Sequence, residues 1–290
     1  MDSQLLRAFV AVEKHRSFSY AGEELCLTQS AVSKRVNHLE ASLGVPLFER
    51  HNRSISLTEA GQQLLPRALH ILDLMQDTEQ EISNTQRVVQ GHLDIVTSHH
   101  IGLHRLPPVL REFVRRYPNV SINLEFMGSE RAYEAVRKRG AELALTTLDP
   151  DQPKDFVSQA LWTDHLLCVC GPEHQLLDHP ITPETLAITP AILPDQKTIT
   201  YQLVANAFHQ HGLKLHTPMP TNYLETIKMM VSVGLGWSML PSGMVDDSVR
   251  ILSWPVEPLQ RHLGIARLKE RVQSNACKAF LELINRPTFL

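Results

Sequence analysis

The chain has 290 residues and carries 28 basic and 31 acidic side chains, a formal net charge of −3. At ~150 residues per domain this length predicts about two domains. A composition that is 43% hydrophobic and 20% charged excludes disordered, collagen-like and disulfide-stapled chains. The near-neutral charge gives no overall attraction to nucleic acid or to a membrane. Without a run of ~18 apolar residues or a secretory leader, we expect a cytoplasmic protein whose four cysteines are reduced thiols.

Residues 1–58 predict three short helices with tight joints between them. The first surrounds Phe9 and stops at Lys14-His15-Arg16. The second runs from Tyr20 to Leu25 behind the candidate N-caps Ser17 and Ser19, and the third from Gln29 to Leu43 between the N-cap Thr28 and Gly44.

The third helix has two unlike faces. Val32, Val36, Leu39 and Leu43 are spaced to pack on the two preceding helices. The other face is polar, with Ser30, Ser33, Lys34 and Asn37, and with Gln29 at its N-terminal end. Such a helix after a short turn is how a helix-turn-helix reads base edges in the major groove. The alternative is that these residues only form a solvated face.

A small wing is predicted directly after this helix, between Phe48 and Thr58. Asn52 to Ser54 form its turn, and Arg50 and Arg53 are placed to contact phosphate or the minor groove. Residues 1–61 contain seven basic and seven acidic side chains, so charge alone does not establish DNA binding.

At this point the residues resemble a known family, the LysR-type transcriptional regulators. The resemblance lies in many positions that agree in order with that family's winged helix-turn-helix: Phe9-x-x-Val12, Ser17-Phe18-Ser19-x-Ala21, Leu25, Gln29-Ser30-Ala31-Val32-Ser33, Leu39-Glu40, Leu43-Gly44-x-x-Leu47-Phe48-x-Arg50 and Leu57-Thr58-x-Ala60-Gly61. The rest of the chain fits the family's two-lobed, periplasmic-binding-protein-like α/β effector domain. The resemblance therefore covers essentially the full length.

The resemblance implies that Gln29, Ser30, Ser33 and Lys34 read bases, and that Arg50 and Arg53 hold the DNA backbone. Arg35 either faces a phosphate or meets only Glu40 or solvent. Gly22 departs from the family pattern, where Ala is usual, and we expect it to weaken its helix by roughly 1 kcal/mol.

Residues 59–90 predict one long linker helix behind the N-cap Thr58. A narrow apolar stripe runs along it at heptad-like spacing, comprising Leu64, Ala68, Ile71, Met75 and Ile82 with Thr78 in the intervening position. Such a stripe favours pairing with a second copy, as the linker helix does in the family. The alternative is a helix buried within its own chain.

Residues 91–290 alternate strands with amphipathic helices. Strands at Leu93–Ser98, Val120–Phe126 and Leu143–Leu148, with helices between them, predict a parallel βαβαβ sheet. A second α/β unit follows, and a last helix near 272–285 is expected to pack back on the first. We expect lobe I over about 91–161 and 265–290 and lobe II over about 162–264, with a hinged cleft between them.

Ligands of open α/β sheets bind beyond the carboxyl ends of strands, near helix N-termini. That rule, together with the family's known effector position, predicts an effector site of Ser98, His99, His100, Ser129, Thr147, Lys197, Thr198 and Thr200. Hydroxyls, imidazoles, a lysine and helix N-termini favour a small organic anion. Tyr223 and Trp237 either wall this site or belong to the core.

Histidines and cysteines leave further alternatives open. His100 and His104 are spaced to share a metal on a helix, but no acidic third ligand is near in sequence, so we expect no metal and no cofactor. Cys168 and Cys170 share one face of a strand, as buried thiols or as a redox sensor.

The prediction is a bacterial DNA-binding regulator of transcription, activator or repressor, and not an enzyme. Its expected partners are double-stranded promoter DNA, a small effector, a second or further copies in a homodimer or homotetramer, and RNA polymerase if it activates, but no membrane. An enzyme is the second hypothesis, although no nucleophile elbow or P-loop is present. A solute-binding or architectural protein is the third.

Overall fold

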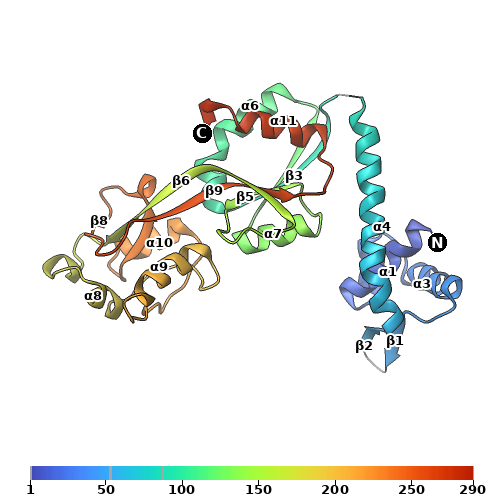
Figure 1. Cartoon of the computed structure of the whole chain (residues 1–290), viewed down its shortest axis with the longest axis horizontal. Helices are drawn as coiled ribbons and strands as arrows, with labels where there is room; N and C mark the ends of the chain where they lie inside the picture. Colours follow the sequence, from blue (N-terminus) through green and yellow to red (C-terminus); the bar gives the residue numbers. More distant parts are fainter. Residues whose placement is uncertain (1, 52–53, 87, 290) are drawn as a thin grey trace. The chain divides into compact units, whose positions relative to one another are not determined.

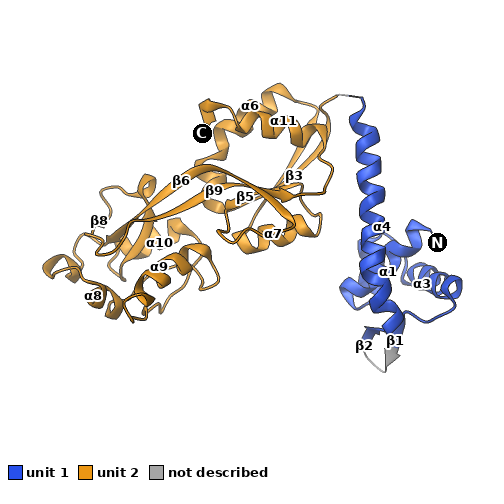
Figure 2. Cartoon of the chain, in the orientation of Figure 1, with its two compact units in different colours: residues 1–86 blue, residues 87–290 orange. Residues whose placement is uncertain are grey.

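The computed structural model describes residues 2–51, 54–86 and 88–289, and it divides the chain into two compact units, 1–86 and 87–290 (Figure 2). Figure 1 shows helices and a two-stranded wing in the first unit and a helix-covered sheet in the second.

The first unit consists of three short helices, a hairpin and one long helix. In chain order these are α1 (Ser3–His15), α2 (Phe18–Glu24), α3 (Gln29–Leu43), the antiparallel pair β1 (Phe48–His51) and β2 (Ser54–Leu57), and α4 (Glu59–Asn84). Asp2, Ser17, Thr28 and Thr58 cap the four helices by accepting a hydrogen bond from a backbone N–H of the first turn. The three predicted helices and the two strands of the wing are therefore confirmed, with the third helix at the predicted residues. Asn52 and Arg53 of the predicted wing turn lie outside the described residues.

Gly22 is required by the turn between α2 and α3 rather than being a weakness of the helix. The N–H of Leu27 donates to the Gly22 carbonyl at 2.8 Å, which folds the turn back onto α2. A Cβ on Gly22 would lie 2.7 Å from the carbonyl oxygen of Leu27. Alanine would raise helix propensity here but would collide with backbone, so the expectation of a simple propensity cost was incomplete.

The two ends of α4 have different surroundings. Ala68 is fully buried, and Leu64, Leu65, Ile71 and Leu72 pack against the core of the first unit. Farther along, Leu74, Met75 and Ile82 are exposed. The first half of the helix thus packs on its own chain, as the alternative predicted. The second half presents apolar side chains to the surface, and its pairing with a second copy stays a prediction.

The second unit is built on one seven-stranded sheet with the order β4-β3-β5-β9-β6-β7, in which β8 also pairs with β6. The strands are β3 (Gly91–Thr97), β4 (Val120–Phe126), β5 (Leu143–Thr147), β6 (Phe156–Cys170), β7 (Ser238–Pro241), β8 (Arg250–Ile251) and β9 (Leu259–Leu268). β3 is parallel to β4 and β5, as predicted, whereas β9 is antiparallel to both β5 and β6.

The long antiparallel strands β6 and β9 join two lobes (Figure 1). The first lobe has α5 (His99–His104), α6 (Leu106–Arg116), α7 (Ser129–Arg137) and α11 (Asn275–Ile284). The second has α8 (Pro183–Ile188), α9 (Ile199–His209) and α10 (Leu224–Ser232). Short 3-10 turns lie at Gln175–Asp178, Ser242–Met244 and Pro287–Phe289. As predicted, the last helix packs on the first lobe, where Phe280 contacts Phe113.

Candidate functional site

The polar side of α3 points away from the core of the first unit. Val32, Val36 and Leu39 are fully buried against it, which confirms the predicted apolar face except at Leu43. Leu43 is exposed because it lies in the last helical turn, beyond the core. On the opposite side Gln29, Ser30, Lys34 and Asn37 are exposed and Ser33 is half-buried, so the predicted residues share one accessible surface.

Arg35 and Glu40 have separate structural partners. Nη2 of Arg35 donates to Oε1 of Gln4 at 2.9 Å and so ties α3 to α1. Oε1 of Glu40 accepts the backbone N–H groups of Leu47 and Phe48 at 2.7 and 3.2 Å. A contact between Arg35 and Glu40, one of the predicted alternatives, is therefore wrong. Glu40 instead fixes the start of the wing relative to α3.

The structure places only one of the two predicted wing arginines in a strand. Arg50 belongs to β1, whereas Arg53 lies outside the described residues. The wing itself begins beside α4, because the Thr58 N–H donates to the Leu47 carbonyl and its hydroxyl donates to Pro46.

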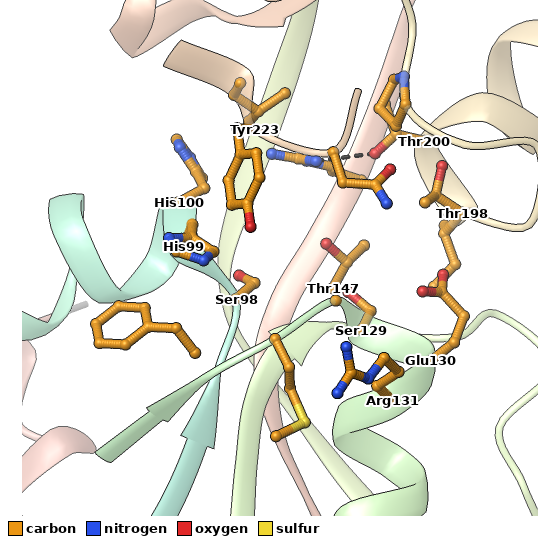
Figure 3. A pocket seen from close by; sticks show the side chains of 18 residues that line it. Ser98, His99, His100, Ser129, Glu130, Arg131, Thr147, Thr198, Thr200 and Tyr223 are labelled. Carbon is orange, nitrogen blue, oxygen red and sulfur yellow. Dashed lines mark hydrogen bonds between the residues drawn. The ribbon is translucent and has the colours of Figure 1, made fainter. Parts of the chain in front are cut away.

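In the second unit a pocket of about 320 Å³ lies between the two lobes. This volume suits a small molecule. Figure 3 shows the side chains around it. The first lobe contributes the ends of β3 and β5 and the start of α7, and the second contributes the starts of α9 and α10. The predicted residues that line it are Ser98, His99, His100, Ser129, Thr147, Thr198 and Thr200.

Lys197 is the predicted residue that does not line this pocket. Its side chain is exposed, and its backbone N–H donates to Oδ1 of Asp195, which turns the loop before α9. The next residue, Thr198, caps α9 by accepting from the Tyr201 N–H. The loop thus presents Thr198 to the pocket and Lys197 to solvent.

Three hydroxyl groups of the first lobe converge on the pocket without using their hydrogen-bonding capacity. Ser98 precedes α5, Ser129 opens α7, and Thr147 ends β5. No hydroxyl of the three has a hydrogen-bond partner within the described part of the chain, and Figure 3 shows all three around the same space. Donors and acceptors left open toward a pocket are positioned for a polar ligand.

A buried ion network stands behind the pocket. Asp164 on β6 accepts from Nε and Nη2 of Arg261 on β9 at 3.2 and 3.0 Å, and Oδ2 lies 3.1 Å from Nε2 of His100. Nη1 of Arg261 donates to the hydroxyl of Thr200 at 2.8 Å. Burial alone would raise the pKa of Asp164, but the His100 contact and the Arg261 charge outweigh it and hold that pKa well below its usual value.

Three charged residues that line the pocket were not predicted from the sequence. Arg261 belongs to a late strand, and Glu130 and Arg131 lie in the first turn of α7, where only Ser129 was expected. Burial raises the pKa of Glu130. Of the two alternatives for Tyr223, pocket wall or core, the structure shows the first, because Tyr223 lines the pocket and is half-exposed. The centroid of its ring lies 4.6 Å from that of His99, in an edge-to-face arrangement. Trp237 is core, fully buried in the second lobe.

The paired cysteines of β6 are ordinary core residues. Cys168 and Cys170 are free, buried and part of the same apolar cluster, as their alternation predicted. Burial raises the pKa of both thiols, which disfavours the reactive thiolate.

Comparison with known proteins matches both units. Residues 3–62 match the model described as "Bacterial regulatory helix-turn-helix protein, lysR family", and residues 86–287 match "LysR substrate binding domain". The chain belongs to the LysR family of transcriptional regulators. This agrees with the resemblance of its N-terminal motifs.

Relatives of similar length support the assignment. The uncharacterized regulator YeiE of Escherichia coli is 30% identical over 96% of this chain and 94% of its own. The fold is like that of full-length OxyR from Pseudomonas aeruginosa, at a TM-score of 0.68 and 23% identity over 98% of this chain and 93% of that one. It is also like full-length CbnR solved with its target DNA, at 0.61 and 19%, covering 99% of each chain.

The relatives are transcriptional regulators and not enzymes, so the enzyme hypothesis fails. Within the described ranges, no helix combines the length and apolar character needed to cross a bilayer.

Proposed function

We propose that this LysR-family regulator binds promoter DNA through the outward side of α3, with the wing arginines Arg50 and Arg53 on the DNA backbone. The observation that supports it best is the exposure of Gln29, Ser30, Lys34 and Asn37 on a helix whose other side is fully buried. A helix anchored in this way can enter the major groove without disturbing its domain.

Lys34 is the most direct test of this proposal. The operator is first selected from a random duplex library with the full chain, and affinity is then measured at fixed salt. Lys34→Ala should weaken binding to the selected operator about 5- to 150-fold, because a base contact contributes about 1–3 kcal/mol. Lys278→Ala, which removes an equal charge from the exposed side of α11, is the matched control and should change little. Equal losses in the two variants would mean that net charge rather than α3 governs binding.

We further propose that the pocket between the lobes binds the effector and that the effector is a small organic anion. The N-termini of α7 and α9 face this pocket, and helix N-termini favour negative charge. Arg131 adds a positive group with no carboxylate partner among the described residues, and the open hydroxyls of Ser98, Ser129 and Thr147 add donors. The carboxylate of Glu130 opposes this charge, so specificity comes from the hydroxyls as much as from charge.

We propose that the exposed second half of α4 pairs with the same helix of another chain. Two copies would then carry two α3 helices, which matches binding to two half-sites on promoter DNA. RNA polymerase is a further partner if the protein activates transcription.

A further inference from the structure

Two histidines of α5 and one glutamate of α10 form a cluster at the edge of the pocket. His100 and His104 are four residues apart and therefore lie on one side of α5, with ring centroids 5.0 Å apart. Glu225 is the second residue of α10, in the other lobe. One ring nitrogen from each histidine and one carboxylate oxygen all lie within 4.8 Å of one another.

His100 has the surroundings of a metal-binding histidine. Its Nε2 faces Oδ2 of Asp164 at 3.1 Å, and Arg261 and Arg105 hold that carboxylate from its other sides. Both ring nitrogens are buried, and neither has a partner with hydrogen-bond geometry in the described part of the chain. Nε2 has this close ionic contact with Asp164, whereas Nδ1 has no such contact. A carboxylate behind one ring nitrogen orients the imidazole so that the other nitrogen can bind a metal ion.

The other two ligands can adjust to a metal ion. Nε2 of His104 lies 2.9 Å from Oε1 of Glu225, and their side chains are 46% and 41% exposed. Ligands of a tetrahedral zinc ion, each at about 2.1 Å from the metal, are separated by about 3.4 Å. The ligand atoms lie up to 4.8 Å apart, so binding zinc requires His104 and Glu225 to rotate, which their exposure permits. Their exposure also provides a path by which the ion can enter.

The alternative is that His104 and Glu225 form only an ordinary ion pair. That would explain why these two residues lie together, but it would not explain the position of His100. It leaves the buried Nδ1 of His100 without a partner, and such a group costs free energy unless something binds it. From the sequence we expected no metal, because no acidic residue lies close in sequence to the two histidines. In the folded chain, Glu225 lies beside His104 although it is 121 residues away in sequence.

We propose that His100, His104 and Glu225 form a Zn²⁺ site that joins the two lobes, with water as the fourth ligand. Two imidazoles and a carboxylate suit zinc. Bound zinc would connect α5 of one lobe to α10 of the other. Because His100 also lines the pocket, zinc and a pocket ligand influence each other's affinity. The site itself does not depend on what the pocket binds.

The test uses the full chain, freed of metal with a chelator and titrated with ZnCl₂ by calorimetry and with CoCl₂ by absorbance. We expect one ion per chain and the visible bands of tetrahedral Co²⁺. His104→Gln and Glu225→Gln should each weaken Zn²⁺ binding at least tenfold and remove the Co²⁺ bands. Both side chains are exposed, so the folded state is expected to survive, and circular dichroism checks this. His179→Gln changes an exposed histidine elsewhere and is the matched control.

Several outcomes overturn the proposal. The first is that the wild-type chain binds no stoichiometric Zn²⁺. The second is that His104→Gln and Glu225→Gln bind it as tightly as the wild type does. The third is that His179→Gln loses as much affinity as they do, or that zinc only causes association detected by light scattering, since either result would mean adventitious binding by surface histidines.

Discussion

Asp164 is the residue on which the organisation of the pocket depends most. It lies on β6, one of the two strands that join the lobes, and it contacts Arg261 on β9, His100 on α5 and Arg105 just after α5. Arg261 is itself buried and reaches Thr200 at the start of α9. One carboxylate therefore positions pocket groups from both lobes, and its removal would leave the buried guanidinium charge of Arg261 uncompensated.

Asp164→Asn is expected to lower the free energy of unfolding by about 3–5 kcal/mol, the cost of breaking a buried ion pair from one side. Asp155→Asn is the matched control, because Asp155 also pairs with an arginine, Arg137, but in a solvent-exposed position. Exposed pairs contribute at most about 1 kcal/mol. Urea unfolding of the full chain measures both variants. Similar losses in the two would contradict a special role for Asp164.

The pocket residues show how far single positions can be predicted from sequence. Ser98, Ser129 and Thr147 were found because the end of a parallel strand or the start of the next helix can be located from the local pattern. Arg261 was not found, because its place in the pocket depends on the pairing of β9 with β6, nearly a hundred residues earlier. Lys197 does not line the pocket, because the turn made by Asp195 determines which loop side chain faces inward.

Helices with a recognisable capping residue at each end and a regular spacing of apolar residues were the most predictable elements. The N-cap Thr28 and the αL residue Gly44 define both ends of α3, and the observed helix begins and ends where they predict. The long strands β6 and β9 were less predictable. β6 runs from Phe156 to Cys170 through both lobes, whereas the sequence indicated only its last residues, around Cys168. A strand whose two halves are buried by different cores shows no single alternation pattern.

The exposed half of α4 leads to a prediction about self-association. Leu74 is 60% exposed and Ile82 is 66% exposed, and Met75 lies seven residues before Ile82 on the same side. Ile82→Asp should weaken dimerisation at least tenfold, because it places a charge where an apolar side chain would be buried. Gln76→Asp adds the same charge at an exposed polar position of α4 and should have little effect. Sedimentation velocity over a concentration series measures this. Unchanged association of Ile82→Asp would place the dimer contact elsewhere.

At the scale of the whole molecule, the proposed function requires DNA and effector to act on one another through the conformation of the chain. The pocket takes residues from both lobes, so a ligand that binds one arrangement of the lobes more tightly shifts the population toward it. If that arrangement changes how two α3 helices are presented, the effector alters operator affinity by some factor. Thermodynamic linkage then requires the operator to alter effector affinity by the same factor.

Thr147 offers a test of both the pocket and this linkage. A panel of small carboxylates is screened by the thermal midpoint of the full chain, since a bound ligand stabilises the folded state. For a compound that binds, Thr147→Val should weaken affinity up to about tenfold, because it removes one hydroxyl contributing about 1 kcal/mol while keeping the shape. Thr163→Val, on an exposed position of β6, is the matched control.

The linkage between effector and DNA is tested with the same compound, whose dissociation constant is then measured with and without operator DNA. Equal affinity of wild type and Thr147→Val would move the effector out of the pocket, and equal affinity with and without operator would mean that the ligand bound there does not regulate DNA binding.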